Sequence, residues 1–126
     1  MSLRISGHPL AVAYCHCIDC RRWTGAPVAA FAAVTPDAVR SVPDLGVGSS
    51  VSPGVRRWNC ADCGSPLACT FDYLPDQVYV PVGIIDQAAE LAPQTHSYED
   101  ARLPWLHIQD DLPRADGSGR AMLNGV

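Results

Sequence analysis

The sequence contains no lysine, few aromatic residues and no long apolar run. Nine arginines stand against 13 acidic residues in 126, so the formal net charge is −4. A chain with this acidic balance lacks the basic surface that nucleic acid or an anionic membrane requires. No stretch reaches the roughly 20 consecutive apolar residues of a membrane span. We therefore expect neither nucleic acid nor a membrane as a partner.

The first ten residues lack the apolar segment and small-residue cleavage site of a signal peptide. We therefore expect a cytoplasmic location, where thiols stay reduced. The six cysteines could in principle pair as disulfides in 15 ways. However, Cys15 and Cys17 are too close in the chain for an unstrained bridge, and the clustered spacing favours zinc.

The strongest motif is Cys15-His16-Cys17-Ile18-Asp19-Cys20. In an extended segment alternate side chains share a face, so Cys15 and Cys17 point one way and His16 the other. The spacer before Cys20 allows the chain to turn back, so that all three sulfurs can converge. Three protein ligands with one exchangeable position are typical of a catalytic zinc. A closed structural zinc, with Cys69 or a histidine as the fourth ligand, is the alternative.

A second motif is Cys60-Ala61-Asp62-Cys63-Gly64. A glycine after the second thiol suits a backbone that takes a positive φ to wrap a metal. One C-x-x-C alone is a weak signal, but C-x-C-x-x-C followed by C-x-x-C-G is specific. We therefore include Cys60 and Cys63 among the expected zinc ligands.

The remaining candidate residues favour structural roles. We expect Cys69 to be a small buried residue on a strand, and His16 to be a hydrogen-bonding or surface residue rather than a ligand. His96 and His107 are more typical of core or loop residues than of catalytic ones, and Asp86 of a turn cap. The tryptophans favour core packing, although one could wall a substrate pocket; they are Trp23, Trp58 and Trp105.

Short apolar segments, eleven prolines and ten glycines predict a mostly β domain over residues 1–114 and a flexible tail over 115–126. Residues 1–7 indicate no element, and residues 103–107 indicate an ordered loop with a buried tryptophan. Helical turns are expected at 19–24, at 36–40 and within 83–91. A Pro-Gly turn is expected at 53–54. Strands are expected at 10–14, 28–34, 55–59, 66–71, 77–82 and 93–98.

On these motifs the sequence resembles the glutathione-dependent formaldehyde-activating enzyme family, over about residues 8–114. The matching segments are Cys15-His16-Cys17-Ile18-Asp19-Cys20-Arg21-Arg22-Trp23-Thr24-Gly25-Ala26-Pro27, Ser52 to Leu67 around the second motif, Val82-Gly83-Ile84-Ile85-Asp86, Pro93 to His96, and Leu103-Pro104-Trp105.

The resemblance implies the Mss4-like fold, with small antiparallel sheets around zinc knuckles. It assigns Cys15, Cys17 and Cys20 to a catalytic zinc. It assigns Cys60 and Cys63 to a structural zinc that an N-terminal C-x-C completes. No cysteine precedes Cys15 here, so we expect the strand that carries this pair to be missing. Cys60 and Cys63 are then free, or they use His8, Cys69 or a partner chain as further ligands. A missing edge strand also leaves backbone groups of the sheet unpaired, which favours a homodimer.

The implied activity is a zinc-dependent carbon–sulfur lyase or S-(hydroxymethyl)glutathione synthase, acting on glutathione or another small thiol. Arg21 and Arg22 could offset the negative charge of a zinc–thiolate site or hold substrate carboxylates. Arg56 and Arg57 are further candidates. The alternative is a non-enzymatic, zinc-stabilised protein-binding module, because a fold alone does not fix function.

Overall fold

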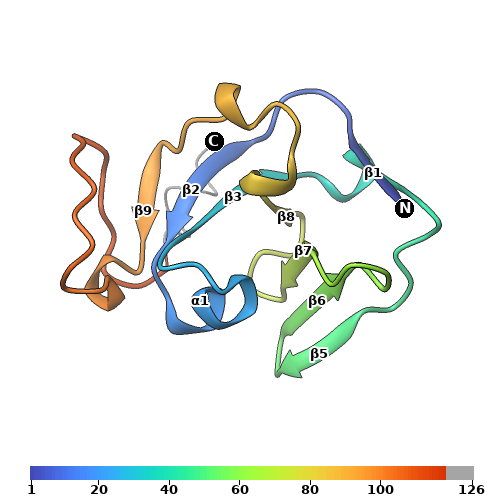
Figure 1. Cartoon of the computed structure of the whole chain (residues 1–126), viewed down its shortest axis with the longest axis horizontal. Helices are drawn as coiled ribbons and strands as arrows, with labels where there is room; N and C mark the ends of the chain where they lie inside the picture. The colour runs from blue at the N-terminus through green and yellow to red at the C-terminus, as the bar shows by residue number, and fades with distance from the viewer. Residues whose placement is uncertain (119–126) are drawn as a thin grey trace.

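The computed structural model describes residues 1–118, and this range is mostly β structure with one α-helix (Figure 1). The helix is α1 (Ile18–Thr24), and four 3-10 turns are η1 (Pro36–Ala38), η2 (Val82–Ile84), η3 (Ala88–Glu90) and η4 (Glu99–Ala101). The strands are β1 (Ser2–Ile5), β2 (Ala11–Cys15), β3 (Ala29–Val34), β4 (Val39–Val42), β5 (Ser49–Ser52), β6 (Val55–Asn59), β7 (Pro66–Phe71), β8 (Val78–Pro81) and β9 (Thr95–Ser97).

Seven strands form one sheet in the order β5-β6-β7-β8-β3-β2-β9, and β1 pairs with β4 in a second, two-stranded sheet. This architecture confirms the predicted mostly β, Mss4-like class. One pairing departs from the antiparallel expectation, because β9 runs parallel to β2. After β8, a long connection through η2 and η3 crosses the sheet to reach β9 on the far side of β2. Parallel strands need a crossover connection of this kind.

All six predicted strands are present at nearly the predicted bounds, but β1, β4 and β5 were not predicted. β1 and β4 pair along their whole length, with Ser2 opposite Val42 and Ile5 opposite Val39. The sequence of residues 1–7 was uninformative, so strand β1 is a finding of the structure alone. β5 is the first arm of the hairpin whose Pro-Gly turn was expected. Short edge strands with few large apolar residues leave little periodic signal.

The core is divided by the two faces of β2 and β3. Ala11 and Ala13 pack with Phe31 on one face, whereas Val12 packs with Ala32 and Val82 on the other. Successive side chains of a strand point to opposite faces. The same alternation, continued past the end of β2, brings cysteine side chains to the first face and a histidine to the second.

One prediction about the C-terminal region was wrong. Trp105 is 64% exposed and not buried. The described start of the expected tail is hydrogen-bonded beside β9, since the Ala115 N–H donates to the carbonyl of His96 at 2.9 Å and the Tyr98 N–H donates to that of Gly117 at 2.7 Å. Backbone groups at this sheet edge thus find partners in a segment of low β propensity. The rest of the expected tail lies outside the described residues.

Gly48 supports strand β6 by close approach, which gives a test of the fold. An added Cβ would lie 2.7 Å from the carbonyl oxygen of Arg57 and from the ring of Trp58, at a φ of +68°. Gly46 has a similar φ of +74° but nothing within 4 Å of its Cβ position. We expect Gly48→Ala to lower the free energy of unfolding by about 1–3 kcal/mol more than Gly46→Ala does. Urea denaturation of both variants measures the difference; equal losses would contradict the packing.

Candidate metal centre and adjoining cavity

The end of β2 and the start of α1 gather three thiols. Cys15 is the last residue of β2, Cys17 is the N-cap of α1 and Cys20 lies in its first turn. The Sγ atoms of Cys15 and Cys17 are 3.4 Å apart, and the backbone N–H of Cys20 donates to Sγ of Cys17 at 3.3 Å. All three sulfurs lie within 4.8 Å of one another. The predicted convergence is therefore present.

The donor set fits a zinc ion. Tetrahedral zinc with bonds to sulfur of about 2.3 Å separates its ligand sulfurs by about 3.8 Å, which agrees with the observed cluster. Hydrogen bonds from Cys15 and Cys20 lower the pKa of Cys17 to about 2, and the hydrogen bond with Cys17 raises the pKa of Cys15 to about 12. One sulfur thus carries charge while its neighbours hold their protons, as crowded thiols do before a cation replaces the protons.

No fourth histidine, cysteine or carboxylate in residues 1–118 joins this group within 4.8 Å. Cys69, the alternative fourth ligand, stands apart on β7 and is 1% exposed. Burial raises the pKa of its thiol to about 11. Cys69 therefore behaves as the predicted small buried residue, and the three sulfurs leave one position for an external ligand.

A cavity of about 390 Å³ adjoins the three sulfurs, which is within the range of small-molecule sites. Among the sequence-predicted substrate residues, Arg57 lines this cavity, whereas Arg21, Arg22 and Arg56 do not. Aromatic side chains supply much of the remaining wall; they are Phe31, Phe71, Tyr73, Tyr79 and Tyr98.

Arg57 is held in place with its charge uncompensated by any carboxylate within 4.0 Å in the described part of the chain. The residue is only 7% exposed. Its guanidinium lies over the ring of Trp23, with Cζ 5.0 Å from the ring centroid, and Nη1 donates to the carbonyl of Asp19 at 3.2 Å. Its Nε–H has no hydrogen-bond partner. Arg57 thus places at the cavity wall a positive charge that no carboxylate of the described residues pairs.

On the opposite face, His16 and His96 form a second buried group with Glu99. Both rings are 0% exposed, and Nε2 of His16 lies 2.9 Å from Nδ1 of His96. Nε2 of His96 lies 2.9 Å from a carboxylate oxygen of Asp110. His16 is therefore a buried, hydrogen-bonded residue and not a surface one, and His96 is the predicted core residue. His107 is exposed in a loop.

The ligand atoms of His16, His96 and Glu99 also lie within 4.8 Å of one another, so this group as well as the cysteine group could bind a metal. Its charge environment disfavours a cation, because Arg102 and Arg114 both contact Oε1 of Glu99, at 3.1 Å and 3.0 Å. A divalent cation bound there would be repelled by the two guanidinium groups that already contact this carboxylate. We therefore treat the histidine group as a hydrogen-bonded network.

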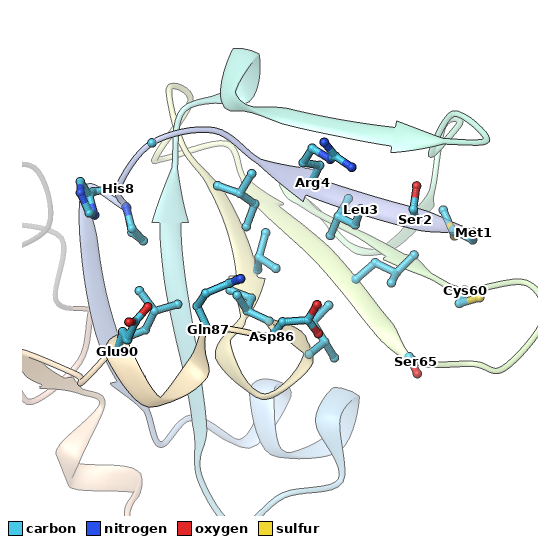
Figure 2. A pocket seen from close by; sticks show the side chains of 18 of the residues that line it. Met1, Ser2, Leu3, Arg4, His8, Cys60, Ser65, Asp86, Gln87 and Glu90 are labelled. Atoms are coloured by element: carbon cyan, nitrogen blue, oxygen red, sulfur yellow. The ribbon is translucent and has the colours of Figure 1, made fainter.

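The second cysteine motif forms a knuckle with the expected glycine conformation. Gly64 has a φ of +78°, and its N–H donates to the carbonyl of Cys60 at 2.8 Å. In the described residues neither His8 nor Cys69 joins Cys60 and Cys63 as a third ligand. A second cavity, distinct from the one beside the three sulfurs, lies next to this motif. Figure 2 shows Cys60 beside Met1 in this second cavity, with His8 at its other end. Strand β1 thus lies where the resemblance places the complementary strand, but its residues supply no thiol.

With the fold and the sites described, comparison with known proteins gives a family. The model of the glutathione-dependent formaldehyde-activating enzymes matches residues 1–101. The chain belongs to this family. No curated protein matches. A crystal structure of a Rhodobacter sphaeroides protein has a similar fold, with a TM-score of 0.50, 19% identity and 90% of each chain covered. No helix of residues 1–118 is long and apolar enough to cross a membrane.

Sequence reasoning found the cysteines but missed Tyr98 and Glu99. Tyr98 lines the cavity. Its backbone has a left-handed conformation, with a φ of 55°, and no pattern in the sequence predicts this conformation. Glu99, the next residue, faces the histidine network. The His16–His96 pair depends on the parallel pairing of β2 with β9, where Tyr14 stands opposite His96. The histidine pair could be predicted from the sequence only if the parallel pairing of β2 with β9 were predicted first.

Metal content distinguishes the two groups that could bind an ion. We expect Cys20→Ser to lower the zinc content by one equivalent per chain, because it removes one of three converging sulfurs. We expect Glu99→Gln, the matched variant in the histidine network, to leave the zinc content unchanged. Elemental analysis of the purified proteins measures both. Zinc lost from Glu99→Gln and kept in Cys20→Ser would place the metal in the network instead.

Thiol reactivity gives a further test of the arrangement. Cys63 is exposed, and its hydrogen bond with the Ser65 hydroxyl lowers its pKa, whereas Cys69 is buried. We expect iodoacetamide to modify Cys63 first in the native protein and Cys69 only after unfolding, because the exposed thiolate is the nucleophile. Peptide mass spectrometry over time follows each site. A native Cys69 that reacts as fast as Cys63 would contradict the burial.

Proposed function

We propose that this protein is an enzyme that makes and breaks a carbon–sulfur bond between a small thiol and an aldehyde. The observation that carries the proposal is a group of three converging cysteine sulfurs, with no fourth protein ligand in the described residues, at the edge of a cavity. Three protein ligands and one exchangeable position are typical of catalytic zinc sites. Membership of the family supports the same class of reaction.

Zinc held by Cys15, Cys17 and Cys20 would keep a substrate thiol deprotonated at neutral pH. The protein supplies the surroundings. Its aromatic walls place apolar surface next to the reacting atoms, which strengthens each electrostatic interaction there. Arg57 lines the same cavity, where its guanidinium would bind a substrate carboxylate. Arg21 and Arg22 lie on α1 away from the cavity wall, so we transfer their proposed role to Arg57.

In the forward reaction, the electron pair of the substrate sulfur forms the new bond to the carbonyl carbon. The π pair of the carbonyl moves to its oxygen, which takes up a proton, so that thiolate, aldehyde and proton give a hydroxyalkyl thioether. Tyr98 is the proposed proton donor. Burial, followed by Tyr73 and the charges of Cys17 and Cys15, raises the pKa of Tyr98 to about 12. Its hydroxyl therefore keeps its proton at neutral pH, and solvent restores it after transfer.

The reverse reaction is a carbon–sulfur lyase step that follows the same path by microscopic reversibility. Glutathione and formaldehyde are the substrates that the family description suggests. A cytoplasmic location and a homodimer stay predictions. A non-enzymatic binding module would suit a closed four-ligand site, and within residues 1–118 the cysteine group has three ligands.

Exchange spectroscopy tests the proposal directly. Zinc-loaded protein is mixed with ¹³C-formaldehyde and a small thiol, and NMR measures the rate at which the adduct and the free aldehyde interconvert. We expect acceleration by the unaltered protein, and none by Cys20→Ser. We expect Tyr98→Phe to be slower by on the order of a hundredfold, as for loss of a general acid. Arg40→Gln, which alters an exposed residue of β4 away from the cavity, is the control that keeps full activity.

Protein that binds zinc at the three cysteines but leaves the exchange rate unchanged with every thiol tested would refute the proposal. Full activity in Tyr98→Phe would refute only the assignment of the proton donor.

A further inference from the structure

The cavity beside the three sulfurs has a composition that selects among thiols. We propose that its substrate is a thiol adduct with an aromatic or other apolar body and a single carboxylate, in which the carboxylate binds Arg57. This inference rests on the proposed function and specifies the substrate class of the same site. It differs from a tripeptide thiol such as glutathione, which carries two carboxylates and an ammonium group.

The walls favour an apolar body. Five aromatic rings line a space of about 390 Å³, together with the aliphatic side chains of Val55 and Leu74. Phe71 contacts both Tyr73 and Tyr79, with ring centroids 5.6 Å and 5.5 Å apart. Tyr79 is buried and donates its hydroxyl to Gln77, so it presents ring surface to the cavity. Such walls bind aromatic groups through apolar contact and ring packing.

The charge distribution favours one carboxylate. Arg57 and Asp19 are the charged residues that line the cavity among those described. Arg57 is more than nine-tenths buried and has no carboxylate partner within 4.0 Å in residues 1–118. A buried cation without a counter-ion is unfavourable. An incoming carboxylate would remove this imbalance.

The orientation of Arg57 suits such a ligand. Its guanidinium carbon lies over the Trp23 ring, and Trp23 in turn stacks on Phe31, with centroids 6.0 Å apart and planes 7° from parallel. This contact and the hydrogen bond from Nη1 to the carbonyl of Asp19 hold the guanidinium in place before a carboxylate arrives. A planar, fixed fork of N–H donors binds carboxylates with geometric selectivity.

The same features disfavour glutathione. Its second carboxylate would find no second cation among the described lining residues, since Arg21, Arg22 and Arg56 lie off the cavity. Either that carboxylate is desolvated against aromatic rings, which is costly without a hydrogen-bonding partner, or it remains outside and leaves the apolar walls unused.

Binding to the zinc-loaded, unaltered protein tests the inference without any variant. Isothermal titration compares 2-benzyl-3-mercaptopropanoate, its primary amide and glutathione. We expect the carboxylate to bind on the order of tenfold to a hundredfold more tightly than the amide, as for a hydrogen-bonded charged group. We also expect it to bind more tightly than glutathione. Equal binding of acid and amide, or tighter binding of glutathione, would overturn the inference.

Two neighbouring arginines on β6 give a matched pair of variants. Arg57→Gln should reduce the preference for acid over amide to about one, while both compounds still bind through the thiol. Arg56→Gln should keep the full preference, because Arg56 is exposed and donates to the carbonyl of Val47 at 2.8 Å. Circular dichroism and zinc content confirm that each variant is folded. A folded Arg57→Gln that keeps the preference would also overturn the inference.

Failure of this inference differs from failure of the proposed function. If glutathione is turned over and the aromatic acid gains nothing from its carboxylate, the substrate class is wrong and the reaction stands. If the aromatic acid binds with the expected selectivity but no thiol supports exchange with an aldehyde, the site is correct and the reaction is wrong.

Discussion

The structure depends on the way in which strand β2 ends. A strand delivers successive side chains to opposite faces, and β2 keeps this alternation until α1 begins at Ile18. Cys15 and Cys17 therefore reach one face of the sheet, while His16 is buried on the other. A shift of one residue would exchange these positions and disperse the sulfurs. The register of β2 against β3, with Cys15 opposite Ala29, thus fixes the chemistry.

Both faces beyond this point are closed by segments from the C-terminal third of the chain. β9 lies parallel to β2 and contributes His96, and the segment that follows it returns Asp110 and Arg114 to the same network. On the other face, Ser97 and Tyr98 line the cavity. A short parallel edge strand therefore joins the histidine network to the wall of the candidate site. Its hydrogen bonds also explain why the described residues beyond Pro113 are paired.

Much of this arrangement could be predicted from the sequence, for reasons that vary with the feature. The two cysteine motifs and the strands that lead into them are local, because spacing and apolar alternation determine them. The Arg57 site is not local. Its position relative to Trp23 depends on how β6 packs against α1. Arg56 and Arg57 are identical neighbours in the sequence, and they differ only in the face of the strand to which each side chain points. Trp105 was predicted to be buried and is exposed. The identity of a large apolar side chain in a loop does not indicate whether another segment covers it.

The core around the cavity is built largely from alanines, and this limits how the site can change. Ala13, Ala29 and Ala33 are buried in the cluster that adjoins the cysteines, and an alanine has no side-chain atoms beyond Cβ to remove. Enlarging any of them would push the sheet apart in a closely packed interior. Related chains that accept other substrates would therefore vary this pocket through its larger side chains, such as the aromatic rings, Val55, Leu74 and Arg57. Divergence of specificity within such a scaffold would be concentrated on a few large side chains, while the backbone and the three converging cysteines remain the same.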